Sequence, residues 1–111
     1  MTESTKITYA DFKKVELKVA EVLSVAAHPN ADKLYLLKIR IGDEERQIVA
    51  GLRPYYQPGQ LQGKKIIVVA NLEPRAVRGE VSNGMLLAAQ DGTNVIFLAP
   101  ERDIVSGSVI L

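Results

Sequence analysis

The chain has 111 residues, of which 47% are hydrophobic, which is enough apolar material for one core but not for two. We therefore expect a single domain spanning residues 1–111, and the absence of cysteine excludes disulfide bonds and thiolate zinc sites. The net charge of +1 neither requires nor excludes a polyanionic partner.

A short helix and a long strand are predicted at the start of the chain. Residues Thr8–Asp11 have the Thr-x-x-Asp form of a helix N-cap, with Phe12 and Val15 as inward contacts. Residues 16–25 alternate as a half-buried strand does, although Glu21 interrupts the inner row and indicates a bulge or a paired carboxylate. The apolar residues of that inner row are Leu17, Val19, Leu23 and Val25.

The next segment predicts a hairpin. Residues 28–34, HisProAsnAlaAspLysLeu, favour an ordered loop because the proline restrains the backbone and the Asn and Asp side chains can hydrogen-bond nearby amides. Residues 34–41 alternate again, and the GlyAsp pair at 42–43 predicts a turn into a return strand at 46–50. The two prolines of residues 53–58 exclude a central strand and favour a turn or a single helical turn.

A buried strand followed by a polar loop dominates the second half. Residues 60–63 form a polar connector into a strand at residues 64–72, where four consecutive β-branched residues suit burial on both faces. A loop follows at residues 73–84, and the apolar residues 85–89 predict another strand. These two strands would hold the loop out toward a ligand.

Turns and strands continue to the last residue. AspGlyThrAsn at residues 91–94 is typical of a tight turn, with a return strand at residues 95–98. The apolar segment 105–111 would favour aggregation on a bare edge, so we expect it to pack against a second copy. The whole pattern predicts an all-β fold, a five-stranded oligonucleotide/oligosaccharide-binding (OB) barrel with a short N-terminal helix and a C-terminal dimerisation extension.

Basic residues concentrate in the middle of the chain. Between Lys33 and Arg78, nine Lys and Arg residues outnumber four acidic ones, whereas the flanks are acidic. Such a distribution provides either a basic surface for phosphate groups or ordinary solvated strand faces. The loop at 73–84 carries Arg75 and Arg78 together with glycines that allow a ligand to approach the backbone.

Residues for catalysis are scarce. His28 is the only histidine, and its place beside a proline favours a loop residue satisfied by the backbone. The sequence holds no metal-ligand cluster and no glycine-rich phosphate loop, so we expect no enzyme activity, cofactor or metal. The first residues lack a secretory signal, and no apolar run approaches the roughly 20 residues of a membrane span. A cytoplasmic protein without a membrane partner is expected.

Three segments carry a resemblance to a known family. They are HisProAsnAlaAspLysLeu at residues 28–34, ValAlaGlyLeuArgProTyrTyr at residues 49–56, and residues 64–89. Through them the chain, from residue 9 to 111, resembles the tRNA-binding OB-fold domain family, in particular its free-standing members and the β-subunit or C-terminal domain of methionyl-tRNA synthetase. The resemblance implies a homodimer that recognises the folded L-shape of tRNA, free or as a cofactor of an aminoacyl-tRNA synthetase.

The resemblance and the residue chemistry together predict an RNA-binding surface. Arginine suits bidentate phosphate contacts, lysine adds contacts of little sequence specificity, and Ser and Asn side chains can hydrogen-bond ribose or base edges. Met85 equally suits a core position at the start of a strand. The expected RNA-binding residues are Lys33, Arg40, Arg53, Lys64, Arg75, Arg78, Ser82, Asn83 and Met85.

Two other functions stay open at this point. Aromatic residues make up only 5% of the chain, which favours recognition of folded RNA by shape and leaves Tyr35 and the Tyr55–Tyr56 pair as packing residues. A dimer with an apolar groove could instead bind peptides as a secretion chaperone does. The chain could also act only as an obligatory β subunit of methionyl-tRNA synthetase.

Overall fold

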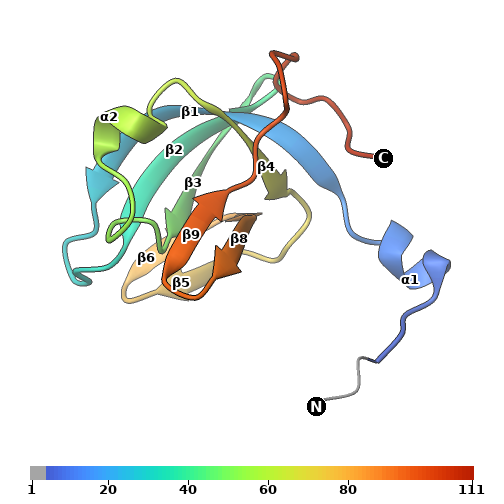
Figure 1. Ribbon diagram of the computed structural model, residues 1–111, viewed down its shortest axis with the longest axis horizontal. Coiled ribbons are helices and arrows are strands. Elements are labelled where there is room, and N and C mark those ends of the chain that lie inside the picture. The colour runs from blue at the N-terminus through green and yellow to red at the C-terminus, as the bar shows by residue number, and fades with distance from the viewer. Residues whose placement is uncertain (1–4) are drawn as a thin grey trace.

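The computed structural model describes residues 5–111, and its centre is a curled sheet of five antiparallel strands (Figure 1). Across the sheet the order is β3-β2-β1-β4-β7. The end of β6 (Glu80–Ser82) and the residue after it close the curl against β3, since Val49 N donates to Ser82 Oγ and Asn83 N donates to Gln47 O. The predicted all-β, five-stranded OB-type fold is therefore confirmed. The strands of the sheet are β1 (Leu17–Ala27), β2 (Tyr35–Ile41), β3 (Glu44–Ala50), β4 (Lys65–Val69) and β7 (Met85–Leu86).

The core lies inside the curl and includes residues of β1, β2, β3 and β4. Tyr35, Leu37, Ile39 and Ile41 are all buried, as their period of two predicts. Gly42 has φ +63° in the turn to β3, a left-handed conformation that glycine adopts without strain. The predicted β2–β3 hairpin is confirmed.

The inner row of β1 differs from the prediction. Ala20 and Val22 belong to the core, and Val25 packs against it, because the pairing register with β2 shifts between Val22 and Ser24. A β-bulge inserts one extra residue and so exchanges the two faces of the strand. Of the predicted inner row, Val19 is buried and Val25 packs against the core, whereas Leu17 and Leu23 are only half-buried, so the prediction is correct in part. Both features predicted near Glu21 are present, since Glu21 pairs with Arg40 and the bulge lies directly after Val22.

Two short helices flank the barrel. Helix α1 (Tyr9–Lys13) is capped by Thr8, whose side chain accepts a hydrogen bond from Asp11 N at 3.0 Å. Phe12 and Val15 are exposed, so the inward contacts expected of them are absent from the described chain. No helix within residues 5–111 is long and apolar enough to cross a membrane.

Helix α2 (Pro58–Leu61) occupies part of the segment that we expected to be a polar connector. Leu61 is completely buried and belongs to the core, so this helix covers one end of the barrel. One apolar residue in a polar stretch carries no period, which is why sequence alone missed it. The predicted turn at 53–58 is present, with Tyr55 N and Tyr56 N both donating to Leu52 O.

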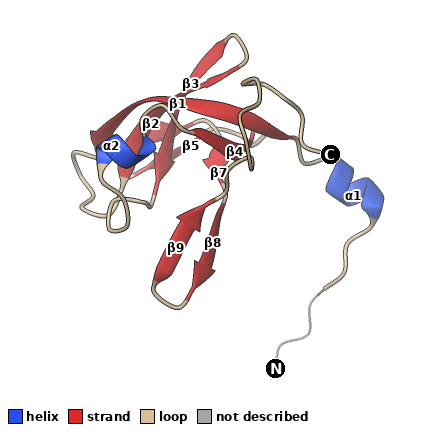
Figure 2. Ribbon diagram, turned by 45° about the horizontal axis from the view of Figure 1, so that its top comes forward, coloured by secondary structure: helices blue, strands red, loops and turns tan. Residues whose placement is uncertain are grey.

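Two hairpins extend from the barrel. Strands β5 (Arg75–Val77) and β6 (Glu80–Ser82) form a hairpin where a loop was predicted. Strands β8 (Ala88–Asp91) and β9 (Asn94–Phe97) form the predicted second hairpin, which projects away from the barrel in Figure 2.

The C-terminal segment returns to the barrel and pairs with β1. Gly107 N donates to Val19 O at 2.7 Å, Val19 N donates to Ser108 O at 2.9 Å, and Ile110 N donates to Leu17 O at 2.9 Å. Earlier in the same segment, Asp103 accepts a hydrogen bond from Lys65 Nζ at 2.9 Å. This bond and the charge of the lysine lower the pKa of the Asp103 carboxyl group. Part of the C-terminal segment that we expected to contact a second copy thus pairs with β1 of its own chain.

Candidate nucleic-acid interface

The tip of the β5–β6 hairpin is a two-residue turn that presents an arginine. Val77 pairs with Glu80, and between them Arg78 has φ +54° and Gly79 has φ +92°. Two successive positive φ values define a type I′ turn, which matches the twist of the flanking strands. Glycine suits the second position, whereas a left-handed arginine is uncommon and strained.

The loop at residues 28–34 clamps this turn. Asn30 Nδ2 donates to Arg78 O and Arg78 Nη2 donates to Asn30 O, both at 3.2 Å. His28 Nε2 donates to Val77 O at 2.9 Å, while its Nδ1 accepts from Asn30 N at 2.9 Å. Because His28 is buried with both ring nitrogens bonded, it fixes the spacing between loop and hairpin. The expectation that the backbone satisfies this histidine is confirmed.

Two further cations border the same loop. Arg53 Nη1 lies 3.5 Å from Ala31 O, and Lys33 is exposed within the loop itself. With Arg78 they surround the loop that follows β1, and we call Lys33, Arg53 and Arg78 the basic corner. In OB barrels, oligonucleotides bind to the loop after the first strand and to the loop before the last strand. The corresponding segments here are residues 28–34 and the β5–β6 hairpin, and these two segments meet at the basic corner.

Arg75 lies further along the hairpin, beside a small hollow. Arg75, Met85, Leu72 and Glu73 line this hollow, whose volume is about 300 Å³. The sequence left Met85 either in the core or on the RNA-binding surface. Met85 is 41% exposed, which excludes the core position. Arg75 at the start of β5 and Met85 at the start of β7 therefore border one hollow at the base of the hairpin.

Ser82 is used inside the fold. It is 4% exposed, accepts a hydrogen bond from Val49 N at 2.9 Å and donates one to Gly84 O at 3.0 Å. Since its hydroxyl is both buried and bonded, Ser82 holds the β6–β7 connection against β3, and we leave it out of the interface. Asn83 beside it is half-buried.

Arg40 and Lys64 lie apart from the basic corner. Arg40 pairs with Glu21, and its carbonyl accepts a bond from Ser106 of the C-terminal segment. Lys64 borders a hollow between helix α2 and strand β9. The predicted residues therefore do not all share one surface, because alternation along β2 and the turn before β4 direct these two side chains elsewhere.

Sequence reasoning missed two structural roles near the interface. Asn30 is the residue that joins loop and hairpin, and its only signal was an amide side chain following a HisPro pair. Arg46, counted among the basic residues, binds Ala70 O and Glu44, and its hydrogen bond and charge lower the pKa of Glu44. Within residues 5–111 no group of His, Cys, Asp or Glu side chains is arranged to hold a metal.

Comparisons with known proteins show which family the sequence resembles. Residues 17–109 match the model of the family described as "Putative tRNA binding domain". The chain is 47% identical over 108 residues to the methionine–tRNA ligase of Pyrococcus horikoshii, covering 97% of this chain and 15% of that protein. It is 49% identical over 104 residues to the ligase of Caldanaerobacter subterraneus subsp. tengcongensis, covering 94% of this chain and 16% of that protein. The chain thus spans roughly a sixth of these relatives.

Solved structures share the barrel. The CsaA chaperone protein from Picrophilus torridus superposes with a TM-score of 0.89 at 32% identity, covering 96% of this chain and all of that one. A protein related to methionyl-tRNA synthetase from Pyrococcus horikoshii superposes with a TM-score of 0.90 at 30% identity, covering 97% of this chain and 100% of that one. These likenesses agree with the OB-type fold found here.

Proposed function

Because the chain belongs to the tRNA-binding domain family, we propose that it is a non-catalytic module that binds tRNA through the basic corner and the β5–β6 hairpin. The observation that carries this proposal is the clamp of His28 and Asn30 on the hairpin turn. A held turn presents Arg78 at little cost in conformational entropy when RNA binds.

Recognition by shape follows from the chemistry of the basic corner. Guanidinium groups suit bidentate contacts with phosphates, which lie at fixed spacings on a folded RNA and carry little sequence information. We therefore propose that the domain reads the contour of folded tRNA. Arg75 on the hairpin and Asn83 and Met85 just beyond it would contact the same RNA, with Lys33 and Arg53 on the loop side.

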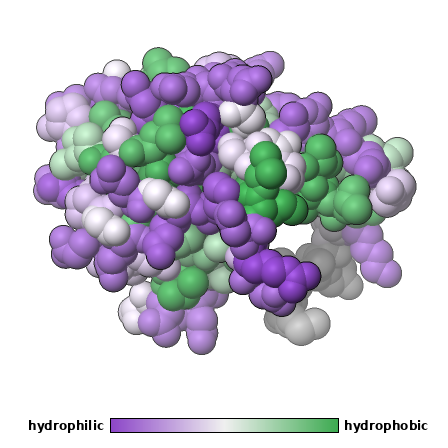
Figure 3. Space-filling view, turned by 90° about the horizontal axis from the view of Figure 1, so that it is seen from above, coloured by the Kyte–Doolittle hydropathy of each residue, from purple (hydrophilic) through white to green (hydrophobic). Residues whose placement is uncertain are grey.

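The surface around helix α1 supports the proposal of a homodimer. Figure 3 shows apolar side chains gathered toward the end of the molecule that carries α1. Val15 and Val109 border one hollow of about 310 Å³ between α1 and the C-terminal segment. Burying these groups against a second copy removes them from water and doubles the number of basic corners. The exposed apolar residues near α1 and in the C-terminal segment include Tyr9, Phe12, Val15, Val105, Val109 and Leu111.

The relatives suggest the cellular setting. Those named above are methionine–tRNA ligases, of which this chain matches only a small part. We propose that the domain delivers or holds tRNA for an aminoacyl-tRNA synthetase in the cytoplasm, either free, as a β subunit of methionyl-tRNA synthetase or as a part of a longer chain. In each case residues 1–111 act as one domain.

A second candidate function is peptide binding of the chaperone type. The observation that favours it is the likeness to the CsaA chaperone protein together with the exposed apolar surface near α1. Peptide binding in an apolar groove would depend weakly on salt, whereas RNA binding falls steeply as salt rises. Salt dependence therefore separates the two.

Replacing Arg78 by Ala tests the proposed function. The matched control is Lys14→Ala, which removes the same charge from an exposed side chain next to α1. We expect Arg78→Ala to weaken tRNA binding several-fold and to lower the slope of log K against log salt by about 1, as for the loss of one phosphate contact. Unchanged affinity in Arg78→Ala, with the fold intact by circular dichroism, would remove the hairpin from the interface.

A further inference from the structure

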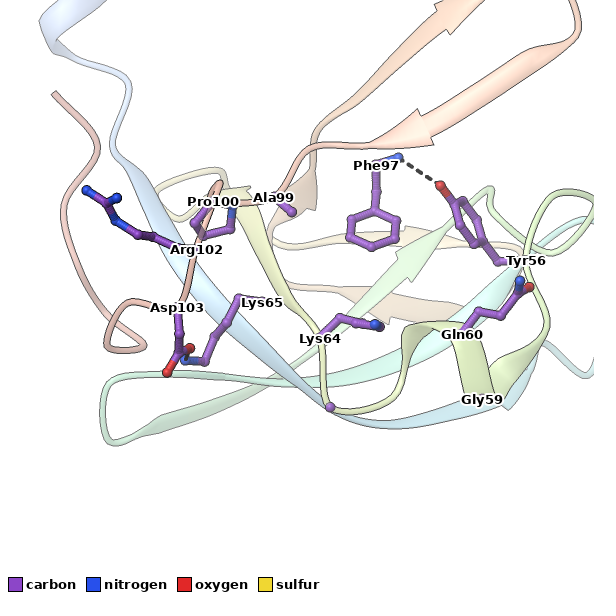
Figure 4. Close-up of a pocket in the computed structure, with 11 residues that line it drawn as sticks. Tyr56, Gly59, Gln60, Lys64, Lys65, Phe97, Ala99, Pro100, Arg102 and Asp103 are labelled. Atoms are coloured by element: carbon purple, nitrogen blue, oxygen red, sulfur yellow. Dashed lines mark hydrogen bonds and ion pairs between the residues drawn. The ribbon is translucent and has the colours of Figure 1, made fainter.

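The hollow beside Lys64 lies away from the basic corner and has a composition of its own. It lies between helix α2, the start of β4, the end of β9 and residues 99–103, with a volume of about 790 Å³ (Figure 4). Tyr56 and Phe97 form one wall, and Gln60 and Lys64 extend toward the same space. A volume of this size lies within the range of small-ligand sites, roughly 300–1,000 Å³.

The two rings are held in place by hydrogen bonds. Their centroids lie 5.2 Å apart with the planes tilted by 58°. Phe97 N donates to the Tyr56 hydroxyl at 3.4 Å, and Tyr35 OH donates to Tyr56 O at 2.7 Å. Both rings also pack against the core from half-buried positions. The wall is therefore a rigid aromatic surface with one side open.

The free polar groups of the hollow are hydrogen-bond donors. Among residues 5–111, Lys64 Nζ has no carboxylate within ion-pair distance, and Gln60 Nε2 has no acceptor. By contrast, Gln60 Oε1 accepts from Gln57 N at 2.7 Å, and Lys65 is committed to Asp103 and Ile104 O. An anion that also carries an aromatic plane would satisfy both the lysine and the rings.

We propose that this hollow binds one unstacked nucleotide of an RNA, with its base against Tyr56 and Phe97 and its phosphate on Lys64. Gln60 Nε2 would donate to an acceptor on the base edge. Stacking tolerates any base, since every base has a π-face, so the site adds affinity with little sequence preference. The inference rests on the proposed function, and it adds a contact to a single-stranded part of the RNA that the basic corner does not supply.

An acidic peptide with an aromatic side chain is the competing ligand. The geometry favours the nucleotide because the unpartnered groups are donors, whereas an extended peptide backbone presents donors and acceptors in alternation. Asp103, the carboxylate at this hollow, is already paired with Lys65 and exposed to water. We therefore keep the peptide as an outcome of the test.

Amide chemical shifts of ¹⁵N-labelled protein give the test. Adenosine 5′-monophosphate, adenosine and ribose 5-phosphate serve as probes, and we expect the monophosphate to shift the amides of Gly59, Gln60, Gly63 and Lys64 most. Lys64→Ala should weaken the binding of the monophosphate at least threefold and leave the binding of adenosine unchanged, because adenosine carries no phosphate for the lysine to bind. Phe97→Leu should weaken the binding of adenosine. Thermal unfolding of this variant is measured to confirm that its core remains folded.

The outcomes separate this site from the basic corner. Arg78→Ala should keep full binding of the monophosphate while losing tRNA affinity. Absence of shifts at the hollow, or shifts of equal size in Lys64→Ala, would overturn the nucleotide site, even where wild-type protein binds tRNA and Arg78→Ala weakens it. The same amides responding to a Phe-Glu-Glu peptide but not to the monophosphate would reassign the hollow to peptide binding.

Discussion

His28 determines how firmly the hairpin turn is held, because it bonds Val77 O on one side and Asn30 N on the other while nearly excluded from water. His28→Ala removes both bonds and leaves the part-buried carbonyl of Val77 without this partner. We expect a loss of about 1–3 kcal/mol in the free energy of unfolding, measured by urea titration. The affinity for tRNA should fall as well, because the basic corner loses its fixed geometry.

A matched variant shows which bond matters. Asn30→Ala removes the side-chain bond to Arg78 O but leaves the backbone bond from Asn30 N to His28. The destabilisation should therefore be smaller than that of His28→Ala. Equal losses in both variants would show that the histidine does not carry the clamp.

Residue chemistry could be predicted from sequence more readily than residue partners. Arg75 and Arg78 are exposed on the hairpin, as charged side chains usually are. The burial of Ser82 and the pairing of Arg40 with Glu21 depend on strands that are far apart in the chain. No local pattern encodes such partners, which is why the site predicted from sequence is broader than the surface that we propose.

The connection from β6 to β7 depends on a glycine. Gly84 has φ +125°, and a Cβ there would lie 3.2 Å from Val69 O and 3.5 Å from Ile48 Cγ2. Gly84→Ala therefore forces a strained backbone against two fixed neighbours. We expect a loss of about 1–3 kcal/mol in the free energy of unfolding, read from thermal or urea unfolding.

Gly59→Ala is the control for that change. Gly59 lies in helix α2, and a Cβ there meets nothing within 4 Å. Alanine favours a helix more than glycine does, so this variant should be neutral or gain up to about 1 kcal/mol. A neutral Gly84→Ala would mean that the β6–β7 connection relaxes more easily than the structure indicates.

Long elements with a clear period were predictable, and short or irregular ones were not. Strand β2 follows its alternation throughout, whereas β5 and β6 have three residues each, too few to establish a period. In β1 the bulge between Val22 and Ser24 changes which residues point inward. A bulge requires a partner strand, so its effect on the inner row could not be predicted from one strand alone.

We propose that the apolar surface formed by α1 and the C-terminal segment sets the oligomeric state. Val109 is 66% exposed there, and Val109→Glu places a charge in the proposed contact. We expect the wild-type protein to sediment as a dimer and this variant as a monomer with an unchanged circular dichroism spectrum. Ile96→Glu, at a 57% exposed position on β9, should remain dimeric. A monomeric wild-type protein would contradict the proposed dimer.

The most direct test compares the affinity of the protein for folded tRNA with that for an unstructured RNA of equal length. Fluorescence anisotropy at about 50 and about 200 mM salt measures both the preference and its electrostatic part. A clamped basic corner that reads phosphate positions predicts binding to folded tRNA at least about tenfold tighter, a difference of roughly 1.4 kcal/mol, and a steep fall with salt. Equal affinity for the two RNAs, or affinity that salt leaves unchanged, would contradict recognition of folded tRNA by this surface.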